Sequence, residues 1–383
     1  MNLRKFLTVF MLLSILMTPV KHSLAEDWAD DAQLYTAIDE EGRPLFTRSG
    51  VISEGDEYIS TDNMLYRIVS VSAGTAKARL IGQETMPDVS WLDAGEIQAV
   101  FAPAAQPAGA KAKQDDRRLI AMYVTHSDES YIPSDGTESI NGQGGIYDVA
   151  REFRDALQAK GIDVILDEST HLPHDSGAYR RSRQTAERLL QKRPDAIIDI
   201  HRDGIPDQSE YTCTIDGENA SQVRLLVGRS NQNSEVNREF AKEIKAVADK
   251  QYPGLIKDIF IGKGNYNQDL SPNAILLEFG THTISKERVL NSTDLMADVV
   301  STTLYGKQTS GAKSESAAAQ PEKEKSIRGP LSAILLMAAV IITGILLFSF
   351  LQTGSGSAMK TKIGRNLSEL TGGMMGSKRK KTK

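Results

Sequence analysis

The sequence contains one cysteine, Cys213, in 383 residues. One thiol cannot build an internal disulfide framework, and it excludes a zinc site made of several thiolates. Neither sign of charge dominates, because 45 Lys and Arg stand against 50 Asp and Glu. This mildly acidic balance argues against a dedicated nucleic-acid-binding protein, whose basic residues cluster on one face. Repeats at solenoid periods are also missing. The hydrophobic residues, at 40%, suffice for a core, so the chain is expected to fold as two modest domains or one large one.

The first 25 residues have the pattern of a secretory signal. Arg4 and Lys5 precede an apolar stretch from Phe6 to Val20, and the segment ends at Ser23-Leu24-Ala25. The stretch is short for a bilayer span, so we predict a signal peptide over residues 1–25. An uncleaved N-terminal anchor is the alternative, and either one exports the residues that follow.

A second apolar run, residues 331–351, contains no charged side chain. A helix of about 21 residues at about 1.5 Å each can cross the roughly 30 Å of bilayer hydrocarbon. The segment after it, residues 352–383, is basic and includes Lys378 to Lys381. By the positive-inside rule this tail is cytoplasmic and residues 26–328 lie outside. The sequence therefore predicts a single-pass protein of the cell membrane, with a transmembrane helix over residues 331–351.

Composition divides the exported part into two regions. Residues 102–116 are rich in Ala, Pro and charge, and residues 306–328 resemble them, so both are expected to be linkers. Residues 31–100 hold short β-branched and aromatic runs separated by Gly-containing turns, which indicates a small β domain. Residues 117–305 alternate apolar strands with helical patterns, which predicts an α/β fold with a mainly parallel sheet and flanking helices. The strands are expected at 119–124, 163–166, 196–200, 223–227 and 275–279, and the helices at 147–160, 178–191, 234–251 and 285–305.

Three of the predicted strands end at residues able to bind metal or transfer protons. His126 follows the strand 119–124, His201 follows the strand 196–200, and Glu278 lies near the end of the third. Because ligands of open α/β sheets bind at the carboxyl ends of the strands, these side chains are expected at one edge. Glu129 lies three residues after His126, where a turn can direct both side chains to one ion.

This set fits a catalytic zinc site with His126, Glu129 and His201 as ligands and one position left for water. Glu278 would then be the general base, because a carboxylate inside a buried strand needs a partner or a proton-transfer role. Arg202 could bind a substrate carboxylate or stabilise the oxyanion, and a salt bridge to Asp199 or Asp203 is the alternative. Each histidine taken alone could instead be a hydrogen-bonding surface residue. The reaction that suits the whole set is amide hydrolysis.

Five motifs occur in an order that resembles the stage II sporulation protein P family, relatives of the zinc-dependent N-acetylmuramoyl-L-alanine amidases. The resemblance covers about Leu119 to Tyr305. The motifs are Thr125 to Tyr131, His174-Asp175 with Arg180 and Ser182, Asp199 to Asp203, Tyr252 to Leu255, and Tyr266 to Pro272 running into Leu276 to Gly280.

The resemblance implies an amidase/phosphorylase-like fold and a peptidoglycan hydrolase that separates muramic acid from the L-alanine of the stem peptide. It matches His126 and His201 to metal ligands and Glu278 to the catalytic glutamate. The third ligand stays open between Glu129 and Glu138. It also implies Zn²⁺, a role in sporulation and engulfment, and a lytic transglycosylase partner, stage II sporulation protein D. Two other functions remain: a zinc endopeptidase that cuts peptide cross-links, and a non-catalytic wall-binding scaffold.

Overall fold

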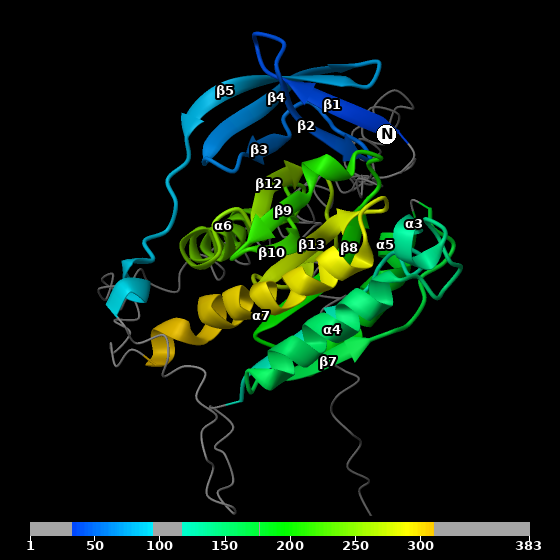
Figure 1. Ribbon diagram of the computed structural model, residues 1–383, viewed down its shortest axis with the longest axis vertical. Helices are drawn as coiled ribbons and strands as arrows, with labels where there is room; N and C mark the ends of the chain where they lie inside the picture. Colours follow the sequence, from blue (N-terminus) through cyan, green and yellow to red (C-terminus); the bar gives the residue numbers. More distant parts are fainter. Residues whose placement is uncertain (1–32, 95–116, 176, 310–383) are drawn as a thin grey trace, which may run out of the picture. The chain divides into compact units, whose positions relative to one another are not determined.

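The computed structural model describes residues 33–94, 117–175 and 177–309 (Figure 1). The predicted signal peptide, the linker at residues 102–116, the transmembrane segment and the basic tail lie outside these ranges. Among the described residues, no helix combines the length and the apolar composition that a membrane span needs. The last helix, α7 (Lys286–Thr309), extends past residue 306, so the predicted linker there begins as helix.

The leading segment folds into five strands. These are β1 (Leu34–Ile38), β2 (Pro44–Ser49), β3 (Glu57–Ile59), β4 (Met64–Ser72) and β5 (Thr75–Gln83), followed by the short helix η1 (Ser90–Ala94). The strand β2 was not predicted. Its partner β1 pairs with it antiparallel, and a register shift between Ala37 and Ile38 bends the pair.

The second region alternates strands and helices as predicted. Its strands are β6 (Leu119–Tyr123), β7 (Asp163–Asp167), β8 (Ala196–Asp203), β9 (Thr212–Ile215), β10 (Glu218–Ser221), β11 (Val223–Gly228), β12 (Ile256–Gly262) and β13 (Ala274–Thr281). Its helices are α3 (Ile132–Asp135), α4 (Ile146–Ala159), α5 (Ala178–Leu190), η3 (Gln208–Glu210), α6 (Ser234–Gln251), η4 (Gln268–Leu270) and α7. The hairpin β9–β10 and the buried strand β12 were not predicted.

Helix α4 shows how the local sequence sets an element. Its apolar residues recur every three or four positions, so Ile146, Val149, Phe153 and Leu157 form one buried face. Gly161 follows the helix with φ +77°, a left-handed conformation that suits glycine after a helix end. The prediction of a helix that stops at Gly161 is therefore confirmed by the backbone.

One sheet of 11 strands joins both regions, in the order β2-β1-β5-β4-β3-β12-β11-β13-β8-β6-β7. From β12 to β7 the pairs are parallel except for β11 with β13. The leading strands pair mostly antiparallel and join through β3 and β12. The α/β class is therefore confirmed, whereas the mainly parallel sheet holds only for the second region and the whole sheet is mixed.

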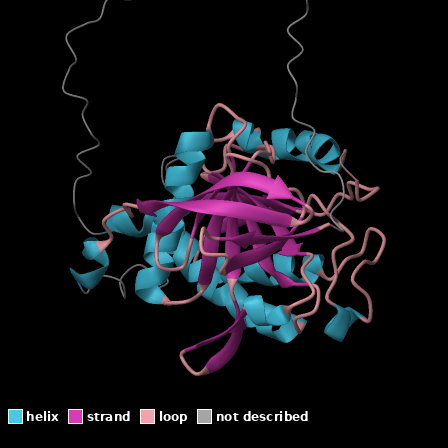
Figure 2. Cartoon of the chain, turned by 90° about the horizontal axis from the view of Figure 1, so that it is seen from above, coloured by secondary structure: helices cyan, strands magenta, loops and turns pink. Residues whose placement is uncertain are grey.

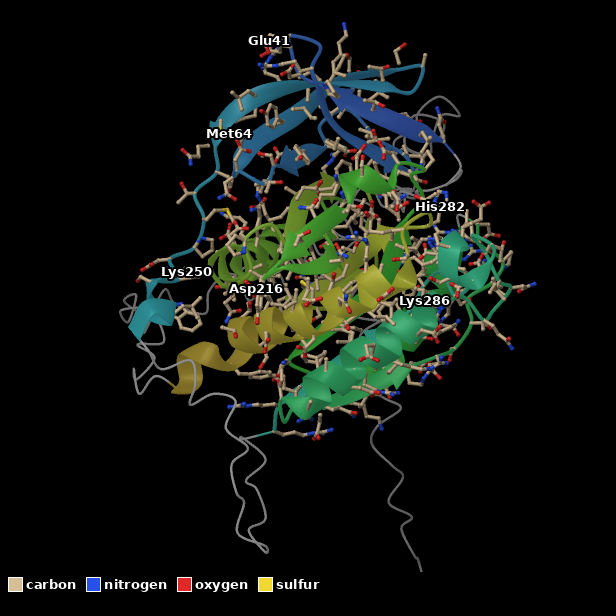
Figure 3. All side chains as sticks on the ribbon, viewed as in Figure 1. Glu41, Met64, Asp216, Lys250, His282 and Lys286 are labelled. Carbon is tan, nitrogen blue, oxygen red and sulfur yellow. The ribbon has the colours of Figure 1, made fainter. Side chains whose placement is uncertain are left out.

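Helices cover both faces of the second region (Figure 2). Side chains that alternate along each strand face opposite ways, so Leu225 and Leu277 pack with α4, α6 and α7 in one core. On the other face, α5 packs on β6 and β8. Lys286 lies at the start of α7 (Figure 3). Its Nζ pairs with Asp135 of α3 at 2.5 Å and with Asp148 of α4 at 2.6 Å.

The leading strands curl over the face opposite α6 and α7. Phe46 of β2 and Tyr58 of β3 share a core with Leu226, Phe260 and Leu276. In a flat sheet the seven spacings from β2 to β13 would separate these strands by more than about 30 Å. Curvature instead brings β2 back over β13, which places it next to the site described below.

Candidate metal and catalytic site

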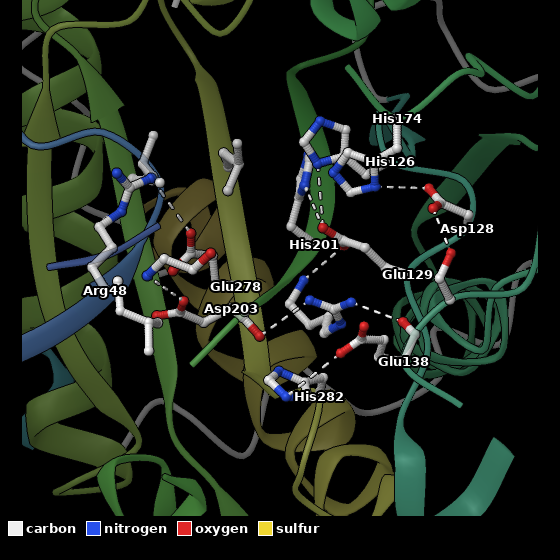
Figure 4. Close-up of a pocket in the computed structure, with 18 of the residues that line it drawn as sticks. Arg48, His126, Asp128, Glu129, Glu138, His174, His201, Asp203, Glu278 and His282 are labelled. Atoms are coloured by element: carbon white, nitrogen blue, oxygen red, sulfur yellow. Dashed lines mark hydrogen bonds and ion pairs between the residues drawn. The ribbon is translucent and has the colours of Figure 1, made fainter. Parts of the chain in front are cut away.

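A pocket of about 830 Å³ opens at the carboxyl ends of β8 and β13 (Figure 4). His126, Glu129, His201, Arg202 and Glu278 all line it. The end of a parallel strand is where an α/β sheet can present side chains that are not covered by its helices. The edge expected from the sequence is therefore the edge at which these residues meet.

The loop after β6 places His126 and Glu129. The backbone N–H of Glu129 donates to the His126 carbonyl at 3.2 Å, which closes a tight turn. Gly144 lies against this turn, and a Cβ there would come within 2.2 Å of the Glu129 carbonyl oxygen. The side chain of Glu129 is held from β8, because its carboxylate oxygen Oε2 accepts a hydrogen bond from the Arg202 backbone N–H at 3.0 Å. Glu129 is thus fixed from both its own loop and β8.

Strand β8 supplies His201 and its neighbour Asp199. Residues two apart on a strand face the same way, and Asp199 Oδ1 lies 3.0 Å from His201 Nε2. This is an ion-pair distance, although the geometry at Nε2 is not that of a hydrogen bond. Thr125 donates to Asp199 from its backbone at 2.9 Å and its hydroxyl at 2.6 Å. Asp199 therefore orients the His201 ring so that Nδ1 faces Glu129.

The spacing of the donor atoms fits a divalent metal. Glu129 Oε1 lies 3.3 Å from His126 Nδ1 and 3.5 Å from His201 Nδ1. Ligands bound at about 2.0–2.2 Å in a tetrahedron are about 3.3–3.6 Å apart, as in zinc sites. Among the described residues, these three are the group of His, Cys, Asp and Glu whose ligand atoms all lie within 4.8 Å of one another. All three are buried.

The ionisation of Glu129 and His126 suits a metal, whereas that of His201 does not. Burial would raise the pKa of Glu129, but His201, His126 and Arg202 hold that pKa well below its usual value, so the carboxylate is charged. Burial lowers the pKa of His126, which favours the neutral imidazole that can act as a ligand. For His201, burial is outweighed by Asp199 and Glu129, which raise its pKa well above 6.5, so a metal ion would have to displace a proton from this ring.

Glu278 lies on β13 beside His201, its register partner on β8. Its Oε2 is 3.2 Å from the Tyr211 hydroxyl, which is also 2.9 Å from Asp203 Oδ2. Burial together with Asp203 raises the pKa of Glu278 to about 7, despite the opposing charges of Arg224 and Arg48. A carboxyl group that titrates near neutral pH can both take up and release a proton under physiological conditions.

Comparison with known proteins identifies the family of this chain. The sequence profile of the stage II sporulation protein P family matches residues 73–301. The chain belongs to this family. Stage II sporulation protein P of Bacillus subtilis is 30% identical over 225 residues, which cover 54% of this chain and 56% of that protein. The resemblance noted in the sequence is confirmed, and the match spans a little over half of that relative.

Solved amidase structures align with about half of this chain. N-acetylmuramoyl-L-alanine amidase AmiC2 of Nostoc punctiforme aligns at 15% identity and TM-score 0.32, covering 50% of this chain and 97% of that one. Ami1 of Mycobacterium smegmatis aligns at 17% identity and TM-score 0.34, and the alignment covers 50% of this chain and 99% of that one. The CwlD amidase of Clostridioides difficile, solved in complex with the GerS lipoprotein, aligns at 14% identity and TM-score 0.32. That alignment covers 50% of this chain and 98% of that one. The family assignment rests on the sequence matches and not on these alignments.

The structure separates the two candidates for the third ligand in this family member. Glu129 faces both histidines, whereas the Glu138 side chain is 66% exposed and lies 3.9 Å from His282 Nε2. The Arg202 guanidinium donates to the backbone carbonyls of Ser130, Asp203 and Glu138. Among the described residues it has no ion pair with a carboxylate, so the salt bridge to Asp199 or Asp203 considered above is not formed.

The remaining histidines have different surroundings. His174 stacks on His126 with ring centroids 3.9 Å apart, and its Nδ1 lies 2.9 Å from Asp128 Oδ1. His171 is buried, with Nδ1 2.8 Å from the Val124 carbonyl and Nε2 2.9 Å from the Thr185 hydroxyl. His174 therefore supports the His126 ring, whereas His171 joins elements of the core.

Sequence reasoning missed several residues of the site. Asp199 could have been found, because a carboxylate two positions before His201 on a strand shares its face. Arg224, a cation inside the apolar strand β11, carried the same signal as Glu278. Tyr211 and Arg48 carried none, since only folding places them beside Glu278.

Proposed function

We propose that this protein is a zinc-dependent peptidoglycan hydrolase, an N-acetylmuramoyl-L-alanine amidase that acts in sporulation. One observation carries the proposal. Nδ1 of His126 and Nδ1 of His201 lie 3.3 and 3.5 Å from Glu129 Oε1, and these three residues line the same pocket as Glu278, whose pKa is raised to about 7. Family membership supports the peptidoglycan substrate, and His126, Glu129 and His201 would hold the metal.

The chemistry follows from where the protein's own groups lie. Bound zinc would supply a Lewis acid for the scissile carbonyl and lower the pKa of water to about 7. Glu278 takes the proton from the attacking water and then gives it to the leaving amine nitrogen. Tyr211 and Arg224 limit the orientations of Glu278 through Oε2. The Arg202 guanidinium holds the loop that carries Glu129. That Arg202 also stabilises the oxyanion stays a prediction.

The test uses purified full-length protein with measured zinc content and isolated peptidoglycan, and it identifies the products by mass spectrometry. Wild type is expected to release stem peptides with new L-alanine amino termini and to leave free lactyl groups on the glycan. Glu278→Gln should lower the rate by about 10²- to 10⁴-fold. Glu239→Gln makes the same chemical change at a side chain that is 58% exposed and should leave the rate unchanged.

The products also separate the other two functions. Products with new amino groups but no free lactyl groups would indicate an endopeptidase of peptide cross-links and not an amidase. A zinc-loaded protein that binds peptidoglycan but releases nothing would overturn the enzymatic proposal in favour of a wall-binding scaffold.

We further propose that residues 331–351 hold the enzyme in the cell membrane, with the catalytic region outside and the basic tail inside. The uncharged run and the lysines that follow it support this orientation. Protease added to intact protoplasts should digest the catalytic region and spare a tag on the tail. A lytic transglycosylase partner, stage II sporulation protein D, stays a prediction that co-purification can test.

A further inference from the structure

The leading β segment forms part of the wall of the catalytic pocket. Arg48 and Ser49 at the end of β2, together with Gly50, line the pocket with His201 and Glu278. The profile match begins at residue 73 and therefore does not include β2. The segment that the sequence predicts as a small β domain thus reaches the reacting groups.

Strand β2 is held firmly over β8 and β13. The Ser49 backbone N–H donates to Asp203 Oδ1 at 3.2 Å, and the Thr47 N–H donates to Glu210 Oε2 at 3.1 Å. Phe46 packs edge-on against Phe260, with ring centroids 5.8 Å apart. These contacts fix the backbone from which the Arg48 side chain extends.

Arg48 is buried beside Glu278 (Figure 4). Its guanidinium carbon lies 4.5 Å from the centroid of the Phe260 ring, and Nη1 donates to the Val51 carbonyl at 3.2 Å. Nη2 lies 3.9 Å from Glu278 Oε1. In the described part of the chain, Glu278 is the one carboxylate within ion-pair distance of Arg48. Its Nε is buried and has no hydrogen-bond partner among the described residues.

The second cation near Glu278 is shared among several acids. Arg224 lies 3.6 Å from Glu278 Oε2, but it binds Asp203 at 2.8 Å and Asp258 at 2.7 Å. Three buried carboxyl groups therefore face two guanidinium groups. Without Arg48, three acids would depend on Arg224 alone, and the ionised form of Glu278 would be the least compensated.

We propose that Arg48 is a positioning residue for Glu278, so that the leading β segment completes the active site. Arg48 attracts Oε1 while Arg224 and Tyr211 flank Oε2, and the two oxygens are thereby held in one orientation. The inference rests on the proposed function, because it assigns a task to a neighbour of the general base.

The experiment measures kcat, KM and the pH dependence of kcat/KM for full-length, zinc-loaded Arg48→Met and Arg48→Lys. Apart from Arg48, the titratable and charged groups near Glu278 are His201, Asp203, Tyr211, Arg224 and Asp258, and they remain in both variants. Arg48→Met should lower kcat about 10- to 100-fold, with KM within about 2-fold. Removing a cation raises the pKa of a nearby carboxyl group. The acid limb of the kcat/KM profile, where activity falls as the general base is protonated, should therefore move to higher pH by about one pH unit or more.

Arg48→Lys keeps the charge and should restore most of the wild-type pH profile. Arg43→Met, a change at an exposed arginine just before β2, should behave as wild type. Arg48→Gln is measured in parallel, so that poor packing of one variant does not decide the result. Folding is checked by circular dichroism and zinc content by mass spectrometry.

Several results would overturn the inference. Folded, zinc-loaded neutral variants with wild-type kcat and pH profile would leave Arg48 no role in positioning. A lower kcat with an unmoved acid limb would indicate a structural role, and a change confined to KM would indicate a substrate contact. An inactive wild type would overturn the proposed function itself, whereas an active wild type with unaffected variants would overturn only the inference.

Discussion

Replacing Glu278 by glutamine is expected to stabilise the folded protein at alkaline pH while it removes catalysis. The pKa of Glu278 is raised from 4.5 to about 7, chiefly by burial. Between pH 4.5 and about pH 7, the folded state therefore binds more protons at this carboxyl group than the unfolded state does. The stability contributed by the protonated carboxyl group is fully present below pH 4.5 and is lost as the pH rises to about 7.

The size of the effect follows from the pKa shift. A pKa that rises from 4.5 to about 7 corresponds to at most about 3.5 kcal/mol at pH 8, since a pKa difference of one is worth about 1.4 kcal/mol. Glutamine has no charge to bury and can still bond to Tyr211, but it leaves Arg48 without its carboxylate. We therefore expect Glu278→Gln to raise the free energy of unfolding by about 1–3 kcal/mol at pH 8 and by little at pH 5.

Urea unfolding followed by circular dichroism measures this difference. Wild type and Glu278→Gln are compared at pH 5 and pH 8, with a chelator present so that metal binding does not contribute. Glu239→Gln on the surface of α6 should show no change at either pH. A stability difference that does not grow from pH 5 to pH 8, or a variant less stable than wild type at pH 8, would refute the reasoning.

Three more predictions concern the site and its supports. Glu129→Ala should lower the zinc content measured by mass spectrometry, whereas Glu138→Ala should not; equal loss would refute the choice of ligand. Arg224→Met should cost about 3–5 kcal/mol in urea unfolding because it leaves buried carboxylates unpaired, against less than about 1 kcal/mol for Arg43→Met. Gly144→Ala should cost about 1–3 kcal/mol and weaken zinc binding, because its Cβ would strike the Glu129 carbonyl; unchanged stability would show that the loop yields.

The sequence predicted most elements of the second region. The helical period of α4 and α6 and the apolar runs of β6, β8 and β13 are local patterns, and each survives in the fold. Strand β12 was missed although all its residues are buried, since Lys257 and Asp258 interrupt its apolar run.

Part of the site could be predicted because strand ends converge. His126 follows a recognisable strand, and His201 and Glu278 lie near the carboxyl ends of two others. Parallel pairing of neighbours brings such ends to one edge. The choice of Glu129 over Glu138 could not be made in the same way. Both glutamates follow His126 in the same loop region, Glu129 after three residues and Glu138 after 12. Only the turn held by Gly144 and the Arg202 backbone directs Glu129 inward.

The sequence by itself determined the α/β class, the family and the three residues at the strand ends, because these depend on local periodicity and on motifs. Tertiary structure alone decided the distance between the donor atoms, the raised pKa of Glu278 and the presence of Arg48 beside it. Those properties depend on burial and on how far the sheet curls, and both are set by contacts between residues more than a hundred positions apart. No local pattern encodes such contacts.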